Sequence, residues 1–383
     1  MRHSQHVGVT IGVEEEFLLV DPVTGLPVAA AADVLAAARA AGGTPALHAE
    51  LLGTQVEAAS GVCRSLAELG AQVRDGRRVL AAAAADRGLR LVASGVPVLD
   101  GSPPARTPGP RFDEMHARFT TLVADYQACG CHVHVGVPDR ETGAAVLNHV
   151  APWLPTLLAL SANSALRDGR DHGHASLRMV DQSRFPGSGL PPWFSSAADY
   201  DRQVARLVDC GVLVDDRMTF WLARCSPHLP TVELRAADTV IEPWEAVLQA
   251  ALSRALVRTA LAELAVGREG PRLDPQLAAA AVWAAARYGL RGRAVDPVLG
   301  APTTAVRLVD RLVAWVEPAL REMDDLDRAR AAIVALRGRG TGADRQRAAV
   351  ERGQEAVLDA VTARVWETTP SGNRPGSRER TGI

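Results

Sequence analysis

The chain has 383 residues, of which 47% are hydrophobic, and its formal net charge is −2. This length allows one large or two ordinary domains, and the balanced charge excludes the basic footprint of proteins that bind nucleic acids or membrane surfaces. We therefore expect small-molecule partners. Residues 1–8 lack an apolar core and the apolar stretch 150–160 is short and broken by proline, so neither secretion nor membrane insertion is expected.

Cysteine and lysine usage restricts the chemistry further. The five cysteines are odd in number and form no CxxC pair, which favours a reducing, cytoplasmic location over a disulfide framework. All 42 basic residues are arginine and none is lysine. This excludes a Walker-type phosphate loop, a Schiff-base lysine, a pyridoxal-phosphate anchor and a lysine general base. Any phosphate must be held by arginine, backbone or metal.

A run of acids leads into an apolar segment in residues 12–21, GVEEEFLLVD. In a strand, alternate side chains share a face, so Glu14 and Glu16 point to one side and Glu15 points to the other with its apolar neighbours. Two carboxylates this close raise each other's pKa or need a cation between them. A solvated edge strand is the alternative for this stretch taken alone.

The next segments alternate between helices and strands. A second strand is expected at 54–60, where Glu57 shares a face with Gln55. The remaining pattern predicts a helix at 31–41, a helix at 66–87, a buried strand at 89–95, a functional loop at 100–110 and a helix at 112–125.

Two imidazoles occur in the segment 129–138, CGCHVHVGVP. In an extended chain His132 and His134 share one face, and Cys129 and Cys131 face the core. If this strand joins the same sheet, the imidazoles face the acids, and neutral imidazole is a common metal ligand.

The chain after the histidines reads as a helix at 141–165, interrupted at Pro152 and Pro155. Arg178 and Arg184 then fall in a long irregular region that extends to Trp193. This pattern is typical of a lid or substrate loop, and a surface loop with solvated arginines is the alternative.

A third acid-bearing strand is expected at 231–238, where Glu233 and Arg235 share a face. An arginine two residues from a metal-facing acid can meet a phosphate held by that metal, whereas an exposed ion pair is the structural alternative. Helices are expected at 243–267, 274–288, 303–337 and 343–366. They are predicted to pack on the sheet within one catalytic domain, residues 1–367, followed by a disordered tail, residues 368–383.

Together, these strands carry acids and imidazoles that suit Mg²⁺ or Mn²⁺ better than Zn²⁺. Such a sheet face fits a reaction at nucleotide phosphates, in which divalent cations and arginines neutralise the charge that develops.

These segments resemble the bacterial carboxylate–amine ligases of the glutamate–cysteine ligase type 2 group. The matching pieces occur in family order: residues 12–17, 56–58 with Cys63, 132–136, 161–164 with Ser176 and Arg178, 192–193, 231–235 with Asp238, 288–290, and 342–343 with 345–347. The resemblance implies an α+β, glutamine synthetase-like fold, in which a curved, largely antiparallel sheet forms an active-site funnel with helices on its outer face.

The resemblance also implies an ATP-dependent ligase that joins a carboxylate, such as that of glutamate, to an amine, such as that of cysteine, through an acyl phosphate. Relatives suggest a homo-oligomer. Glu14, Glu16, Glu57, His134 and Glu233 would hold Mg²⁺ or Mn²⁺, and Arg235 and Arg178 would be the catalytic arginines. Arg178, Arg235, His132, Asn163 and Ser164 would contact nucleotide or substrate.

One segment departs from the family. Many members read Gly-Thr-His-Pro where this chain has Ser94-Gly95-Val96-Pro97, which could alter the substrate pocket and leaves the substrates open. Three alternatives remain: a guanidino kinase of the same fold, for which Cys225 is the one candidate reactive thiol, a metal-dependent hydrolase, and a non-catalytic binding protein.

Overall fold

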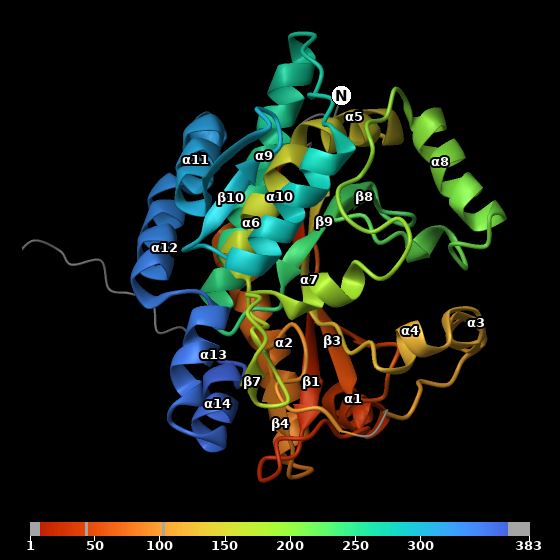
Figure 1. Ribbon diagram of the computed structural model, residues 1–383, viewed down its shortest axis with the longest axis vertical. Coiled ribbons are helices and arrows are strands. Elements are labelled where there is room, and N and C mark those ends of the chain that lie inside the picture. The colour runs from red at the N-terminus through yellow and green to blue at the C-terminus, as the bar shows by residue number, and fades with distance from the viewer. Residues whose placement is uncertain (1–7, 43–44, 102–103, 367–383) are drawn as a thin grey trace, which may run out of the picture.

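The computed structural model describes residues 8–42, 45–101 and 104–366 (Figure 1). Its main sheet has seven strands in the order β2-β3-β1-β5-β9-β8, with β4 paired to β1, and every pairing is antiparallel. This confirms the predicted α+β class. The strands are β1 (Ile11–Val20), β2 (Ala46–Ala49), β3 (Gln55–Ala59), β4 (Arg90–Val92), β5 (Gly130–Gly136), β8 (Ala223–Cys225) and β9 (Thr231–Asp238).

Helices and two small hairpins surround this sheet. The hairpins are β6 (Leu166–Arg167) with β7 (Arg170–Asp171), and β10 (Arg293–Asp296) with β11 (Ala301–Thr304). The helices are α1 (Ala31–Ala40), α2 (Leu66–Ala85), α3 (Pro110–Phe119), α4 (Thr121–Ala124), α5 (Arg140–Val150), η2 (Ala151–Trp153), α6 (Leu154–Ser161), α7 (Leu177–Gln182), α8 (Ala197–Asp209), η3 (Asp216–Met218), α9 (Pro243–Ala265), α10 (Pro275–Tyr288), α11 (Ala305–Glu322), α12 (Leu326–Arg339), α13 (Gly342–Val350) and α14 (Gln354–Val361).

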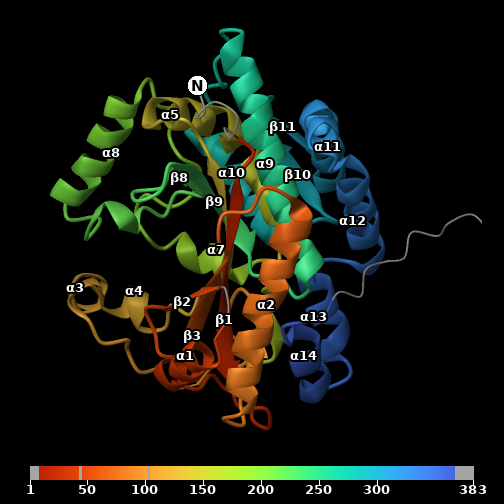
Figure 2. The ribbon, with the colours of Figure 1, turned by 180° about the vertical axis from the view of Figure 1, so that it is seen from behind.

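The two faces of β1 differ as its alternating sequence predicts. Ile11 and Val13 are buried in a hydrophobic cluster that also contains residues of α2 and α9. Figure 2 shows α2 and α9 lying over this side of the sheet. Glu14 and Glu16 point to the other side and are only partly buried. Helix packing therefore leaves one sheet face available for polar groups.

The C-terminal helices pack on the sheet as predicted. One hydrophobic cluster joins residues of β5 and β9 to residues of α9, α11 and α12. The proposed single domain ending at residue 367 stays a prediction, and the expected tail, 368–383, lies outside the described residues.

Several local predictions differ from the structure. The helix predicted at 343–366 is two helices, α13 and α14, separated by a turn at residues 351–353. The helix predicted at 112–125 is split into α3 and α4 at Thr120, and the one at 303–337 is split into α11 and α12 at Asp324; both residues have positive φ, which a continuous helix cannot accommodate. The hairpin β10–β11 was not predicted. The region predicted as irregular around Arg178 contains the short helix α7, which Ser176 caps by accepting a hydrogen bond from the Met179 N–H.

The helical stretch Arg140–Ser161 is long and apolar enough to cross a membrane by length and composition alone. However, 89% of its most apolar window is buried inside the protein. This stretch corresponds to the core helices α5 and α6 with the turn between them, as the prolines predicted.

A buried ion pair joins the sheet to its helical layer. Arg77 of α2 is fully buried and donates to both carboxylate oxygens of Glu15, at 2.9 and 2.5 Å. The same guanidinium donates to the carbonyls of Val240, Ile241 and Arg364. Each donor thus has a partner, which is the condition under which a buried charge pair can be accommodated.

The substitution Glu15→Gln should lower the free energy of unfolding by about 3–5 kcal/mol, because it leaves the Arg77 charge buried without a counter-ion. Denaturant titration would measure the change. The control is Arg78→Leu on the same helix, whose side chain is 53% exposed and pairs with Asp75; its cost should stay below about 1 kcal/mol. Equal costs for the two variants would contradict this interpretation.

Candidate active site

The open face of the sheet brings the predicted acids and imidazoles together. In the strand registers, Glu16 lies opposite Glu57, Glu14 lies opposite His132, and His134 lies opposite Glu233. Neighbouring residues on one face of an antiparallel pair have Cβ atoms about 4.5–5.5 Å apart. The pairing of β3, β1, β5 and β9 therefore makes one continuous polar surface from four separate segments.

The first candidate metal group contains Glu14, His134 and Glu233, whose ligand atoms lie within 4.8 Å of one another. His134 Nε2 is 3.1 Å from Glu14 Oε1, and His134 Nδ1 is 2.9 Å from Thr231 Oγ1. The contact with Thr231 orients the ring so that Nε2 faces the acids. Metal-bound histidines commonly have such a partner on their other ring nitrogen.

The imidazoles present ring nitrogens to the acids on this surface. His134 Nε2 and His132 Nδ1 are buried and face Glu14 at 3.1 and 3.4 Å, but neither contact has good hydrogen-bond geometry. His132 also lies 3.8 Å from Glu16. Burial alone would raise the pKa of Glu14, but the contacts with His132 and His134 hold it well below its usual range. An ionised acid beside two imidazoles fits a divalent cation.

The second candidate metal group contains Glu16, Glu50 and Glu57, also within 4.8 Å of one another. Burial raises the pKa of Glu50 to about 8, with a further contribution from the charge on Glu16. Burial and the charge on Glu50 likewise raise the pKa of Glu57. Three carboxylates in a half-buried cluster repel one another unless protons or a cation neutralise them. Their oxygen-only chemistry suits Mg²⁺ or Mn²⁺.

Glu50 was not predicted from the sequence. It lies between β2 and β3, where no alternating pattern indicates which way a side chain points. Only the turn that brings β2 beside β3 places this residue next to Glu57.

Two arginines surround Glu233. Arg224 Nε donates to Glu233 Oε2 at 2.6 Å, and Arg235 pairs with the other oxygen. Burial would raise the pKa of Glu233, but these two guanidinium groups hold it well below its usual range. Metal binding through Glu233 would require one arginine to share or release an oxygen. Arg224 was not predicted from the sequence as a residue of the site.

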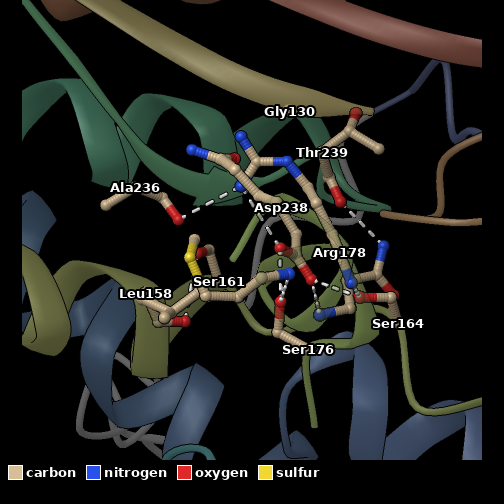
Figure 3. Close-up of polar contacts among 12 residues, drawn as sticks. Gly130, Leu158, Ser161, Ser164, Ser176, Arg178, Ala236, Asp238 and Thr239 are labelled. Carbon is tan, nitrogen blue, oxygen red and sulfur yellow. Dashed lines mark hydrogen bonds and ion pairs between the residues drawn. The ribbon is translucent and has the colours of Figure 1, made fainter. Parts of the chain in front are cut away.

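Arg178 is held beneath the sheet by Asp238 (Figure 3). Its Nη1 lies 3.6 Å from Asp238 Oδ1, and its Nη2 donates to the carbonyl of Arg235 at 3.0 Å. A Cβ atom at Gly130 would lie 2.6 Å from Nη2, so only glycine leaves room for the guanidinium. Arg178 is 3% exposed, so the alternative of a solvated surface arginine is wrong for this residue.

Asp238 is the centre of a buried hydrogen-bond network. Its carboxylate accepts from the Asn163 N–H at 2.9 Å, the Ser164 hydroxyl at 2.7 Å and the Ser176 hydroxyl at 2.8 Å. The Asn163 amide donates to the carbonyls of Ala93 and Thr239. Asn163 and Ser164 are thus fully buried and support the Arg178 segment, and direct contact with a substrate stays a prediction.

The segment 94–97, whose sequence differs from the family pattern, also lies beside this network. A Cβ atom at Gly95 would lie 2.8 Å from both Asp238 Oδ2 and Ser164 Oγ. Val96 is 1% exposed. The segment 94–97 therefore packs against the network that supports Arg178.

A cavity of about 170 Å³ opens beside the acids. We call it the aromatic cavity. Its polar wall includes Glu16, Glu50, Gln55, His132, Arg178 and Arg235, and its apolar wall includes Met115, Val123, Tyr126, Phe185 and Phe220. A larger cavity of about 670 Å³ lies between the segment 187–193, α8 and α10, and contains none of the predicted site residues.

Cys225 does not have the environment that the guanidino-kinase alternative requires. Its side chain belongs to the hydrophobic core, and burial raises the pKa of its thiol to about 11. A reactive cysteine needs a lowered pKa. The structure therefore removes the sequence feature that supported this alternative.

The metal-free protein should lose stability as the pH rises from about 4.5 to about 8, because the folded state binds protons at Glu50 and Glu57 that the unfolded state releases. The substitution Glu57→Gln should weaken this dependence and raise the melting temperature at pH 8 by roughly 2–4 °C. Mg²⁺ or Mn²⁺ should raise the melting temperature of the wild type more than that of this variant, which keeps only the group of Glu14, His134 and Glu233 intact. Calorimetry with chelator and with added metal tests both statements, with the exposed Glu322→Gln as control; a metal response in Glu57→Gln equal to that of the wild type would contradict the assignment.

The substitution Asp238→Asn should lower the free energy of unfolding by about 2–4 kcal/mol, because an amide nitrogen cannot accept the hydrogen bonds that converge on the carboxylate. Ser176→Ala, which removes one donor to this carboxylate and the acceptor that caps α7, should cost only about 1–2 kcal/mol. Denaturant titration of the two variants provides the comparison. Similar costs would mean that the network is not centred on Asp238.

Comparisons with known proteins agree with this architecture. The model of the glutamate–cysteine ligase family 2 (GCS2) matches residues 10–363. A relative from Saccharopolyspora erythraea, provisionally named glutamate–cysteine ligase 2-2, is 56% identical over 363 residues, which are 93% of each chain. A relative from Nocardia farcinica, provisionally named glutamate–cysteine ligase 2-1, is 42% identical over 366 residues, covering 96% of this chain and 94% of its own.

A solved structure shares the fold. The glutamate–cysteine ligase of Francisella tularensis, determined in complex with AMP, superposes with a TM-score of 0.66 over 92% of this chain and 87% of its own, at 13% identity. The family match and the identity to relatives extend over the strands and helices that build the site. The chain belongs to the glutamate–cysteine ligase family 2, a family of carboxylate–amine ligases with the glutamine synthetase-like fold.

Proposed function

We propose that this protein joins a carboxylate to an amine at the expense of ATP, with an acyl phosphate as intermediate. Family membership gives the reaction class. The single observation that carries the proposal is that two candidate metal groups and two arginines gather on one sheet face. The first group contains Glu14, His134 and Glu233, the second contains Glu16, Glu50 and Glu57, and the arginines are Arg235 and Arg178.

The chemistry requires charge neutralisation first. A carboxylate is a poor electrophile, so one of its oxygens attacks the γ-phosphorus of ATP and ADP leaves. The amine nitrogen then attacks the acyl carbon, phosphate leaves, and the amine loses a proton to give the amide. The first step brings an anion to an anion, which is why the site must collect positive charge around the transferring phosphoryl group.

The two acidic groups are suited to hold Mg²⁺ or Mn²⁺. Bound there, a divalent cation would neutralise the charge on the phosphate oxygens. His134 Nε2, which faces Glu14, and the crowded carboxylates of Glu16, Glu50 and Glu57 fit such an ion. We therefore add Glu50 to the metal ligands predicted from the sequence.

The arginines replace the missing lysine. Arg235 has a buried Nε without a hydrogen-bond partner among the described residues, and it lines the aromatic cavity with Arg178. Guanidinium groups offer several donors in a fork that matches phosphate and carboxylate oxygens. We assign Arg235 and Arg178 to bind the phosphoryl group or the carboxylate of a substrate, with His132 beside them.

Glutamate and cysteine are the substrates suggested by the names of the relatives. The small-molecule partners, a homo-oligomeric state and a cytoplasmic location belong to the same proposal. A metal-dependent hydrolase could use the same acids, but it would turn over without nucleotide.

The substitutions Glu14→Gln and Glu233→Gln should each lower ligation by at least about 10²–10³-fold, because each removes a group that neutralises or positions charge in the transition state. ADP release, measured with pairs of acids and amines and with mass detection of the amide, gives the readout. Both variants should stay folded by circular dichroism, since the two side chains face the site. Glu322→Gln, 58% exposed, is the matched control. Normal ATP turnover in Glu14→Gln or Glu233→Gln would refute the ligand assignment, and amide-forming or hydrolytic turnover without ATP would refute the reaction class.

A further inference from the structure

We propose that the larger cavity, lined by the segment 187–193, Trp221, α8 and α10, is a second ligand site that binds an aromatic carboxylate. We call it the α8–α10 cavity. It shares no lining residue with the aromatic cavity beside the acids. The inference therefore goes beyond the ligase reaction and does not depend on it.

The size and the lining of the α8–α10 cavity suit a small organic molecule. Its volume of about 670 Å³ lies within the roughly 300–1,000 Å³ range of pockets that bind small ligands. Most of its lining residues are apolar. The larger of them are Leu190, Pro192, Trp193, Leu207, Trp221 and Leu273. Apolar surface gathered in a concave site is typical of ligand-binding grooves, because a ligand removes that surface from water.

Hydrogen bonds hold the wall at residues 193–194 in place without a ligand. The buried Asn148 side chain donates to the Phe194 carbonyl at 2.8 Å and accepts from the Phe194 N–H at 2.9 Å. The indole N–H of Trp193 donates to the Gly270 carbonyl at 3.0 Å. A Cβ atom at Gly270 would lie 2.3 Å from the backbone carbonyl carbon of Asn148, so only glycine allows this close approach. The wall is therefore formed before a ligand binds, which reduces the entropy that binding costs.

Two tryptophans favour an aromatic ligand. Trp193 and Trp221 both line the cavity. Trp221 is 4% exposed, and its ring packs against the rings of Phe194 and Tyr200, with centroids 5.5 and 5.6 Å away. These contacts fix the orientation of the Trp221 ring. Aromatic rings gain stability from stacked or edge-to-face contacts in addition to the burial of their area.

One charged group at the cavity has no partner. Asp199 of α8 accepts hydrogen bonds from Arg202 at 3.1 Å and from Gln203 at 3.3 Å, so its charge is compensated. Arg206, about one turn after Gln203, also lines the cavity, and its side chain forms no ion pair or hydrogen bond among the described residues. A guanidinium group matches the geometry of a carboxylate. An aromatic acid would place its ring against the tryptophans and its carboxylate at Arg206.

Calorimetric titration of 2-naphthoate into the full-length protein tests the inference by binding alone. 2-Naphthoate should bind at least about 5-fold more tightly than 2-naphthylmethylamine, a cation of similar shape, because the amine brings a like charge to Arg206. Arg206→Gln should weaken binding of 2-naphthoate by about 2–5-fold, the range for an exposed ion pair, and should not weaken binding of the amine. The matched control is Arg307→Gln, which changes an exposed arginine of α11 outside the cavity and should alter neither affinity.

A second variant tests the cavity itself. Ala279 of α10 is exposed and lines the cavity, so Ala279→Trp should fold and place an indole where the ligand binds. The affinity for 2-naphthoate should fall by at least about 10-fold, the lower end of the effect of a misfit in a hydrophobic pocket. Ala331→Trp, at an exposed alanine of α12 outside the cavity, is the control and should leave the affinity unchanged.

Failure of 2-naphthoate to bind, equal affinity for the amine, equal effects of Arg206→Gln and Arg307→Gln, or an unchanged affinity in Ala279→Trp would each overturn the inference. Saturating Mg²⁺ and ADP should leave the affinity for 2-naphthoate within about 2-fold, as for separate sites. Displacement by ADP would overturn the inference and place the acid at the metal-facing sheet. A dimer that Ala279→Trp dissociates, seen by light scattering without binding of 2-naphthoate, would overturn it in favour of a second copy of the chain. The proposed function fails separately, if no acid and amine pair releases ADP from ATP.

Discussion

Electrostatic repulsion among carboxylates on one sheet face is the constraint on which the site depends. Glu14, Glu16 and Glu57 are brought together by strand register, and Glu50 joins them from the turn before β3. Like charges at this spacing are unfavourable unless the surroundings neutralise them. The protein reduces this repulsion in two ways. Arg224 and Arg235 form ion pairs with Glu233, and the pKa values of Glu50 and Glu57 are raised, which favours their neutral, protonated forms.

The opposite face of the same strands stabilises this arrangement. Side chains that alternate with the acids on β1 pack against α2 and α9, and Glu15 is neutralised by Arg77 with the help of backbone carbonyls. A shift of one residue in register would move the acids into the hydrophobic layer. The core thus fixes which carboxylates face the site.

Because the chain has no lysine, arginine serves both as a structural residue and as a residue of the site. Arg77 is buried and fixed by several acceptors, so it acts as a structural group. Arg178 and Arg235 each make fixed contacts within the protein and also line the cavity beside the acids. A planar group with five donors can serve both purposes, whereas a lysine ammonium would offer only a point charge.

The sequence by itself determined the strands that carry the acids and imidazoles, and the face of each on which these residues lie. Period-two alternation pairs Glu14 with Glu16, His132 with His134 and Glu233 with Arg235 within their strands, because alternation in a strand is a local geometric property. Strand pairing in the folded protein then joins these faces into one surface. Glu50, Arg224, the helical course around Arg178 and the supporting role of Asn163 and Ser164 were decided only by tertiary structure. These features depend on turns and on contacts between distant segments, such as that of Asn163 with Asp238, 75 residues apart, which no local pattern encodes.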